Sequence, residues 1–137
     1  MAYKKGIQFE RDCAKELGLG KYGKRVPLSG SIKDVAQLAG DFYLTFPWLD
    51  RAIIGEAKHG YTRAEKSMTL QRDWFEKVAG LAQVHRTYHC VAFKFKNTNM
   101  KYVAFSFEDF QRIMKEMENM YTELEELRDE INNSEEN

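Results

Sequence analysis

Glu56 and Lys58 stand at the end of the apolar stretch "AIIGEAKHG" (residues 52–60), separated by a single residue. Residues two apart in a β-strand project from the same face, so both charges point the same way as Ile54. Asp41 opens the preceding apolar stretch, and a short hairpin between the two stretches places Asp41 beside Glu56 at one end of a sheet. Two carboxylates and a lysine then share a small volume.

This combination predicts a metal-assisted hydrolytic site. Two adjacent carboxylates repel each other unless a cation lies between them, and Mg²⁺ typically binds one or two carboxylates together with phosphate and water. Lys58 could then orient or polarise a water for attack on phosphorus. The alternative is a hairpin with solvent-facing acids, in which Glu56 and Lys58 form an ion pair worth only tenths of a kcal/mol. Glu10 favours the metal site, because it lies on the core side of a predicted amphipathic helix.

The elements that must position these residues follow from hydrophobic periodicity and turn signals. Their predicted order is αβββαββα, a mixed α/β fold with one mixed β-sheet flanked by helices. Helices are predicted over 6–18, 67–84 and 107–131, and strands over 24–28, 41–46, 52–58, 89–95 and 101–107.

The last helix carries apolar residues spaced alternately three and four apart, which is a heptad seam about three repeats long. These residues are Phe110, Ile113, Met117, Met120, Leu124, Leu127 and Ile131. The helix either packs on the rest of the chain or pairs with a second copy, and the sequence does not decide. We therefore divide the chain into a domain over 1–106, an acidic amphipathic helix over 107–131 that supports a dimer in one of these readings, and a disordered tail over 132–137.

Charge is distributed unevenly although the formal net charge is zero. Residues 1–103 hold 18 Lys and Arg against 10 Asp and Glu, whereas residues 104–137 hold 3 against 11. A basic body with an acidic C-terminal segment suggests a polyanionic partner, whereas an amphipathic surface helix that happens to be acidic explains the asymmetry equally well.

Several other classes of protein are disfavoured. No segment approaches 18 uncharged apolar residues, the first residues lack the apolar core of a signal peptide, and the two cysteines are far apart, so we expect a cytoplasmic protein (in the host cytoplasm if a phage encodes it). His85 and His89 lack the further ligands of a zinc site. No nucleotide-binding motif is present, so no nucleotide cofactor is expected, and the lack of a long apolar segment predicts no membrane partner.

The ordered motifs "KGIQFERDCAKEL", "RVPLSGS", "GD" at 40–41 and "EAK" at 56–58 resemble archaeal-type Holliday-junction resolvases of the PD-(D/E)XK nuclease superfamily. The resemblance covers about two thirds of the chain, from Lys5 to about Lys96. It implies a restriction-endonuclease-like sheet and a nuclease domain over 1–106. Gly40 stands where the family usually has proline, "LAQVHRTYH" looks longer than usual, and the heptad helix lies outside the shared region.

The resemblance also assigns roles to residues. Asp41 and Glu56 would bind the metal, Glu10 would complete the metal site directly or through water, and Lys58 would position the attacking water. These four would be the catalytic residues. Residues predicted to bind DNA, from the resemblance and from the basic cluster before the "SGS" loop, are Arg11, Lys24, Arg25, Ser29, Ser31 and Gln71.

The function implied is a Mg²⁺-dependent endonuclease, with Mn²⁺ as a substitute, that acts as a homodimer on branched DNA. Such an enzyme resolves four-way (Holliday) junctions by paired incisions that leave 5′-phosphate ends. The alternatives are a restriction- or repair-type nuclease on duplex or flapped DNA, a non-catalytic DNA-binding module, and a protein-interaction domain built around the heptad helix.

Overall fold

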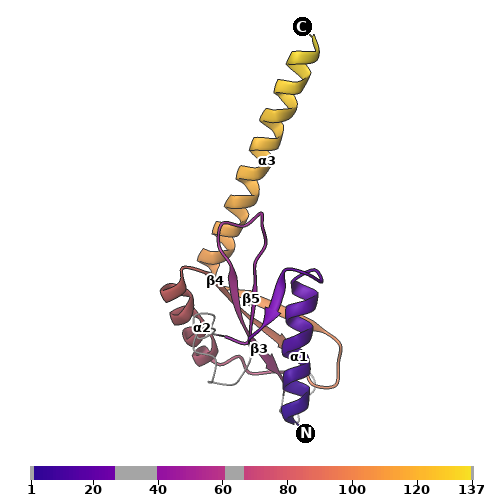
Figure 1. Cartoon of the computed structure of the whole chain (residues 1–137). Helices are drawn as coiled ribbons and strands as arrows, with labels where there is room; N and C mark the ends of the chain where they lie inside the picture. Colours follow the sequence, from indigo (N-terminus) through magenta and orange to yellow (C-terminus); the bar gives the residue numbers. More distant parts are fainter. Residues whose placement is uncertain (1, 27–39, 61–66, 137) are drawn as a thin grey trace. The chain divides into compact units, whose positions relative to one another are not determined.

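The computed structural model of the chain describes residues 2–26, 40–60 and 67–136 (Figure 1). Its element order is αβββαββα, as predicted. The elements are α1 (Ala2–Leu17), β1 (Gly23–Arg25), β2 (Phe42–Leu44), β3 (Ile53–His59), α2 (Arg72–His85), β4 (Tyr88–Lys94), β5 (Lys101–Phe105) and α3 (Phe107–Glu136). The chain divides into two compact units, 1–106 and 107–137, which we describe separately.

The strands of the first unit form one sheet in the order β1-β2-β3-β4-β5. Neighbouring strands are antiparallel except β3 and β4, which are parallel and are joined by the crossover helix α2. A parallel pair needs such a long connection, and an amphipathic helix in this position buries its apolar side on the sheet. The predicted mixed sheet flanked by helices is therefore confirmed.

The two faces of the sheet are covered by different helices (Figure 1). Ile54 of β3 and Val91 of β4 form a buried cluster with Val78 of α2. Because side chains alternate along β3, Glu56 lies on this α2 face together with Ile54. The opposite face meets α1, where the ring of Phe9 contacts His59 with centroids 6.2 Å apart.

The β2–β3 hairpin depends on close backbone packing at Gly55. A Cβ atom on Gly55 would lie 2.0 Å from the Phe42 ring, which is fully buried against it. Phe42 and Gly55 are direct partners in the antiparallel ladder. The missing side chain therefore lets the large ring occupy the space beside the strand that carries Glu56.

Element boundaries differ from the predicted ones where local backbone conformation intervenes. α2 begins at Arg72 rather than near 67, because Gln71 is extended (φ −88°, ψ 132°). It ends where Arg86 adopts a left-handed conformation with φ 56° and its N–H bonds to Ala82 O. The strand expected over 24–28 is described only over Gly23–Arg25.

The second unit is the single helix α3, which continues through Glu136, well into the segment expected to be disordered. Its sequence contains neither glycine nor proline, and Ser134 Oγ donates to Ile131 O near its end. Within the described ranges, no helix is long and apolar enough to cross a membrane.

Candidate active site

β3 carries the acid and the lysine of the candidate site on its α2 face. Glu56 is only 3 % exposed, although it is a carboxylate. Its Oε1 lies 3.3 Å from Lys58 Nζ, and the Lys58 side chain retains about a quarter of its exposure. A buried acid is costly unless charges or hydrogen bonds compensate it, so the neighbouring lysine partly offsets the burial of Glu56.

Asp41 is fixed next to this pair by backbone and side-chain bonds to β3. Its N–H donates to Gly55 O at 2.8 Å, and its Oδ2 accepts the Ala57 N–H at 2.8 Å. β2 pairs with β3 only as far as Gly55, so the carboxylate satisfies a strand N–H that has no partner in β2. Gly40 adopts φ +105°, and a Cβ there would lie 2.6 Å from Ile54. Glycine therefore suits the turn that delivers Asp41.

The electrostatics of the site centre on Asp41. Burial, followed by the nearby charge of Glu56, raises the pKa of Asp41 from 3.8 to about 6. The Ala57 N–H opposes this shift, and the charge of Glu10 adds to it. Three carboxylates therefore influence one small region, and a cation placed among them would lower their mutual repulsion.

Glu10 projects from α1 and is 8 % exposed. Its Oε2 accepts a hydrogen bond from Arg25 Nε at 2.9 Å, which joins α1 to β1. This charge-assisted bond holds both side chains in place. The structure thus pairs two residues for which the sequence predicted separate roles, one in the metal site and one on DNA.

The donor set suits a hard divalent cation held by two carboxylates. Glu56 Oε2 is buried and has no hydrogen-bond partner among the described residues, so an oxygen ligand remains available beside Asp41. Within the same residues, no three His, Cys, Asp or Glu side chains gather as a ready-made metal centre. A site of two carboxylates completed by water and phosphate agrees with both observations and with the usual ligands of Mg²⁺.

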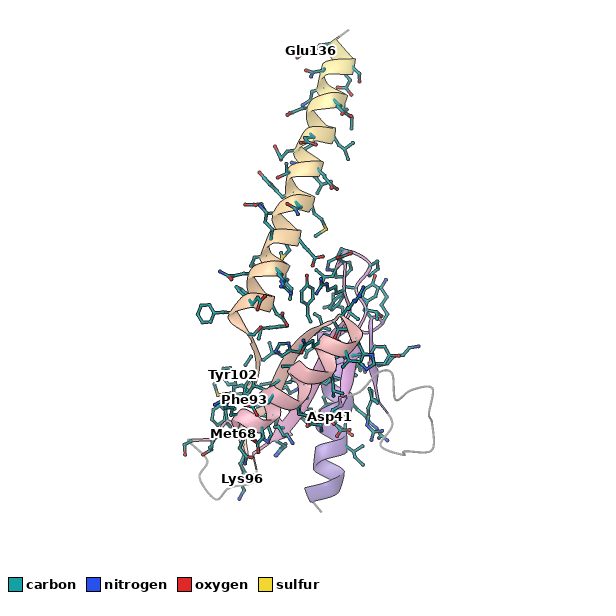
Figure 2. All side chains as sticks on the ribbon, turned by 90° about the vertical axis from the view of Figure 1, so that its left-hand side faces the viewer. Asp41, Met68, Phe93, Lys96, Tyr102 and Glu136 are labelled. Atoms are coloured by element: carbon teal, nitrogen blue, oxygen red, sulfur yellow. The ribbon has the colours of Figure 1, made fainter. Side chains whose placement is uncertain are left out.

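Two residues of α2 that the sequence analysis did not assign reach the site. Lys77 Nζ lies 3.4 Å from Glu56 Oε1, and Lys58 Nζ lies 5.2 Å from the centroid of the Trp74 ring. Both follow from the packing of α2 on β3, and only the helical spacing of Trp74 was visible in the sequence. Beside Lys58 in register lies Phe93, whose ring stacks on Tyr102 (Figure 2).

His59 follows Lys58 but lies on the other face of the sheet. It lines a cavity of about 350 Å³ between α1 and the segment after β4, together with Gln8, Asp12 and Lys94. Its Nδ1 is 3.0 Å from Gly60 O. This alternation separates the cavity from the α2 face that carries Glu56 and Lys58.

The residues predicted to contact DNA have different outcomes. Arg11 and Lys24 are exposed, and Gln71 is exposed at the start of α2. Arg25 is the partner of Glu10. Ser29 and Ser31 lie outside the described residues.

Comparison with known proteins supports the fold and assigns the family. No curated protein matches the chain. Among solved structures, Hjc of Archaeoglobus fulgidus, a Holliday junction resolvase, matches with a TM-score of 0.51 and 22 % sequence identity, over 72 % of this chain and 73 % of that one. At this identity the match shows the fold. The family described as "Phage putative PDDEXK endonuclease" matches residues 2–136, and the chain therefore belongs to this family of PD-(D/E)XK nucleases.

Proposed function

We propose that the chain is a divalent-metal-dependent DNA endonuclease that acts as a homodimer and resolves four-way junctions. The observation that carries this proposal is the buried Asp41–Glu56 pair: Glu56 Oε2 has no hydrogen-bond partner within the described ranges, and Lys58 Nζ lies 3.3 Å from Oε1. A structural ion pair would not require a buried carboxylate oxygen that accepts no hydrogen bond.

Asp41 and Glu56 would hold the metal, and Glu10 would support it from α1, directly or through water, while its Oε2 accepts the hydrogen bond of Arg25. The cation, Mg²⁺ or Mn²⁺, would stabilise the charge that develops on the phosphoryl oxygens and lower the pKa of a nearby water. Ala57 N–H fixes the orientation of the Asp41 carboxylate before any substrate binds.

Lys58 would orient the water that attacks the phosphorus in line, leaving a 5′-phosphate and a 3′-hydroxyl. The Trp74 ring lies beneath its ammonium group and limits the positions that the group can take. Lys77 approaches Glu56 Oε1 from α2 and would keep that oxygen turned away from the metal-binding side.

The first unit supplies the positive charge that DNA binding needs. Arg11, Lys24 and Gln71 are exposed, so the first two are free to contact phosphates. Ser29, Ser31 and Arg25 complete the proposed DNA-binding set. Arg25 holds Glu10 through its Nε, and its remaining guanidinium N–H groups would contact the DNA backbone.

The choice of a four-way junction as substrate rests on the fold shared with Hjc, together with the ordered sequence motifs. A nuclease for duplex or flapped DNA would use the same site chemistry.

The purified chain is incubated with Mg²⁺ on a four-way junction, a flapped duplex and a linear duplex of matched sequence. Glu56→Ala is compared with Glu76→Ala, which removes an exposed acid of α2 that pairs with Arg72. We expect paired incisions in the junction, retained activity in Glu76→Ala and loss of cleavage with retained binding in Glu56→Ala. Equal cleavage of all three substrates would contradict the junction assignment, and no cleavage of any would contradict the nuclease proposal.

A further inference from the structure

The apolar seam of α3 remains available for a partner. In heptad notation Phe110, Met117, Leu124 and Ile131 occupy a, and Ile113, Met120 and Leu127 occupy d. Five of these side chains are between 50 % and 56 % exposed: Phe110, Met117, Leu124, Leu127 and Ile131. The unit is a single helix, so no other element of the same unit covers this stripe.

The polar faces of α3 carry ion pairs between exposed side chains. Arg112 pairs with Glu108 and Lys115 with Glu118, at N···O distances of 2.6 Å in both cases. These residues lie at b, c and f, away from the seam. The 30 residues of α3 extend over about 45 Å, with apolar side chains in one stripe and acidic side chains on the outer faces and along the g row that borders the stripe. This is the pattern of a two-stranded coiled coil.

We propose that α3 pairs in parallel with α3 of a second copy of this chain. In a parallel pair each g residue faces the e residue five positions further along the partner helix. Glu123 at g then faces Arg128 at e of the second copy, on both sides of the seam. Arg128 is 72 % exposed, and among the described residues its ion pair is with Glu125 on the surface, so it can exchange partners at little cost.

The antiparallel arrangement brings like charges together. There the g rows face each other, and Glu116, Glu123 and Glu130 all lie at g. In the register that opposes Ile113 and Ile131, Glu123 would meet its own copy and Glu116 would meet Glu130. Opposite charges at e and g select orientation in coiled coils, and here only the parallel arrangement provides them.

The strong acidity of the last two turns does not reverse this choice. Glu125, Glu126 and Asp129 lie at b, c and f and point away from the partner, where water and salt screen them. Glu130 would face Glu135 of the second copy, but the seam ends at Ile131 because Ser134 occupies the next d position. We therefore expect the pair to fray beyond Ile131 and to be strengthened by added salt.

Parallel pairing has a consequence for the proposed junction cleavage, on which this step rests. Ser106 is the single residue between β5 and α3, so parallel helices attach both nuclease units at the same end of the coiled coil. An antiparallel pair would attach them at opposite ends of a helix about 45 Å long. The parallel arrangement allows two active sites to act on one branched DNA.

Cysteine cross-linking in the full chain tests the orientation. Ile113→Cys and Ile131→Cys are oxidised separately and as a mixture, since a disulfide requires Cα atoms within about 7 Å. Asp129→Cys, at the outward f position, is the matched control. The native Cys13 and Cys90 are buried, and burial raises the pKa of Cys13 to about 12, so the parent chain provides the background.

We expect each seam variant to form a covalent homodimer by itself, whereas the control and the parent do not. Light scattering of the parent should give twice the chain mass of 16.1 kDa. Cross-linking only in the mixture would show an antiparallel pair and overturn the proposal. A monomer, or a dimer that neither seam variant cross-links, would overturn it as well. Nicking of DNA, measured separately, reports on the nuclease proposal and leaves the cross-linking result unaffected.

Discussion

At the scale of single residues, Glu56 is the side chain on which the proposed chemistry depends most. It is nearly inaccessible, it has lysines 3.3 and 3.4 Å from one oxygen, and its other oxygen has no hydrogen-bond partner among the described residues. Burial and an oxygen without a hydrogen-bond partner are both costly in a merely structural residue, and the two lysines offset only part of that cost. Together, the burial and the unpaired oxygen are expected of a carboxylate that binds a metal cation.

Glu56→Gln keeps the size of the side chain and removes the charge. Because even residues that only orient metal ligands change activity 10–100-fold, loss of a ligand should lower the cleavage rate by more than about 100-fold. Initial rates over a Mg²⁺ titration measure this loss. A variant that regains full activity at high Mg²⁺ would show that Glu56 contributes affinity alone.

Asp41 predicts a specific pH dependence of stability. Its pKa is raised from 3.8 to about 6, so the folded protein binds the proton more tightly than the unfolded chain. Without metal, the corresponding stabilisation is complete below about pH 4 and is lost as the pH rises through 6. Asp41→Asn removes this dependence and should be more stable than the parent at pH 7.5, by about 3 kcal/mol.

Urea unfolding at pH 4.5 and 7.5, with and without Mg²⁺, measures the effect. Mg²⁺ should stabilise the parent and leave Asp41→Asn unchanged, because binding to the folded state alone adds stability. Asp129→Asn, on the exposed face of α3, serves as the control. An Asp41→Asn variant that is less stable than the parent at both pH values would contradict the raised pKa.

The two lysines around Glu56 should differ in effect. Lys58 is proposed to position the attacking water, so Lys58→Met should reduce kcat by about 10²–10⁴-fold with little change in Mg²⁺ affinity. Lys77 is 60 % exposed and lies 3.4 Å from Glu56, so Lys77→Met should cause a much smaller loss. Single-turnover cleavage compares the two. Equal losses would show that both lysines act on the reaction.

At the scale of elements, the β2–β3 hairpin positions Asp41 and Glu56. Its close packing depends on Gly55 and on the ring of Phe42. Gly55→Ala would force its Cβ into Phe42 and should destabilise the fold by about 1–3 kcal/mol. Gly80→Ala is the matched control, since a Cβ at this exposed helical position meets nothing within 4 Å. It should stabilise α2 by about 0.5–1 kcal/mol. Thermal unfolding of the two variants should therefore shift in opposite directions.

At the scale of the whole molecule, the chain combines a basic first unit with an acidic helix. Residues 1–106 hold 18 Lys and Arg against 10 Asp and Glu, and residues 107–137 hold 3 against 11. The helix therefore adds little affinity for DNA. Its contribution to cleavage is expected to be the pairing of two active sites.

Leu124→Lys places a charge in the middle of the seam and should separate the two copies. On a supercoiled plasmid with an extruded cruciform, the parent should produce linear product from paired incisions, and Leu124→Lys should produce nicked circles. Thr122→Lys, which introduces the same charge at the exposed f position, should behave as the parent. Linear product from Leu124→Lys at the rate of the parent would show that pairing does not depend on α3.

The sequence by itself determined the order of the elements, because hydrophobic periods of two and of 3.6 are local properties of the chain. Three further features could be predicted from the sequence for the same reason. They are the heptad seam, the common face of Ile54, Glu56 and Lys58 on β3, and the position of Glu10 on the core side of α1. Helix ends were less predictable, since the extended backbone of Gln71 and the left-handed Arg86 leave little trace in residue type.

Only the tertiary structure decided which distant groups meet. Arg25 binds Glu10, Lys77 and Trp74 reach the residues of β3, and Asp41 accepts the N–H of Ala57. These contacts depend on how α1 and α2 pack against the sheet and on where the β2–β3 ladder stops. Packing of this kind is set by side chains far apart in the chain, which no local pattern records. The acids and the lysine were visible in the sequence, whereas their burial, and the raised pKa of Asp41 that results from it, required the fold.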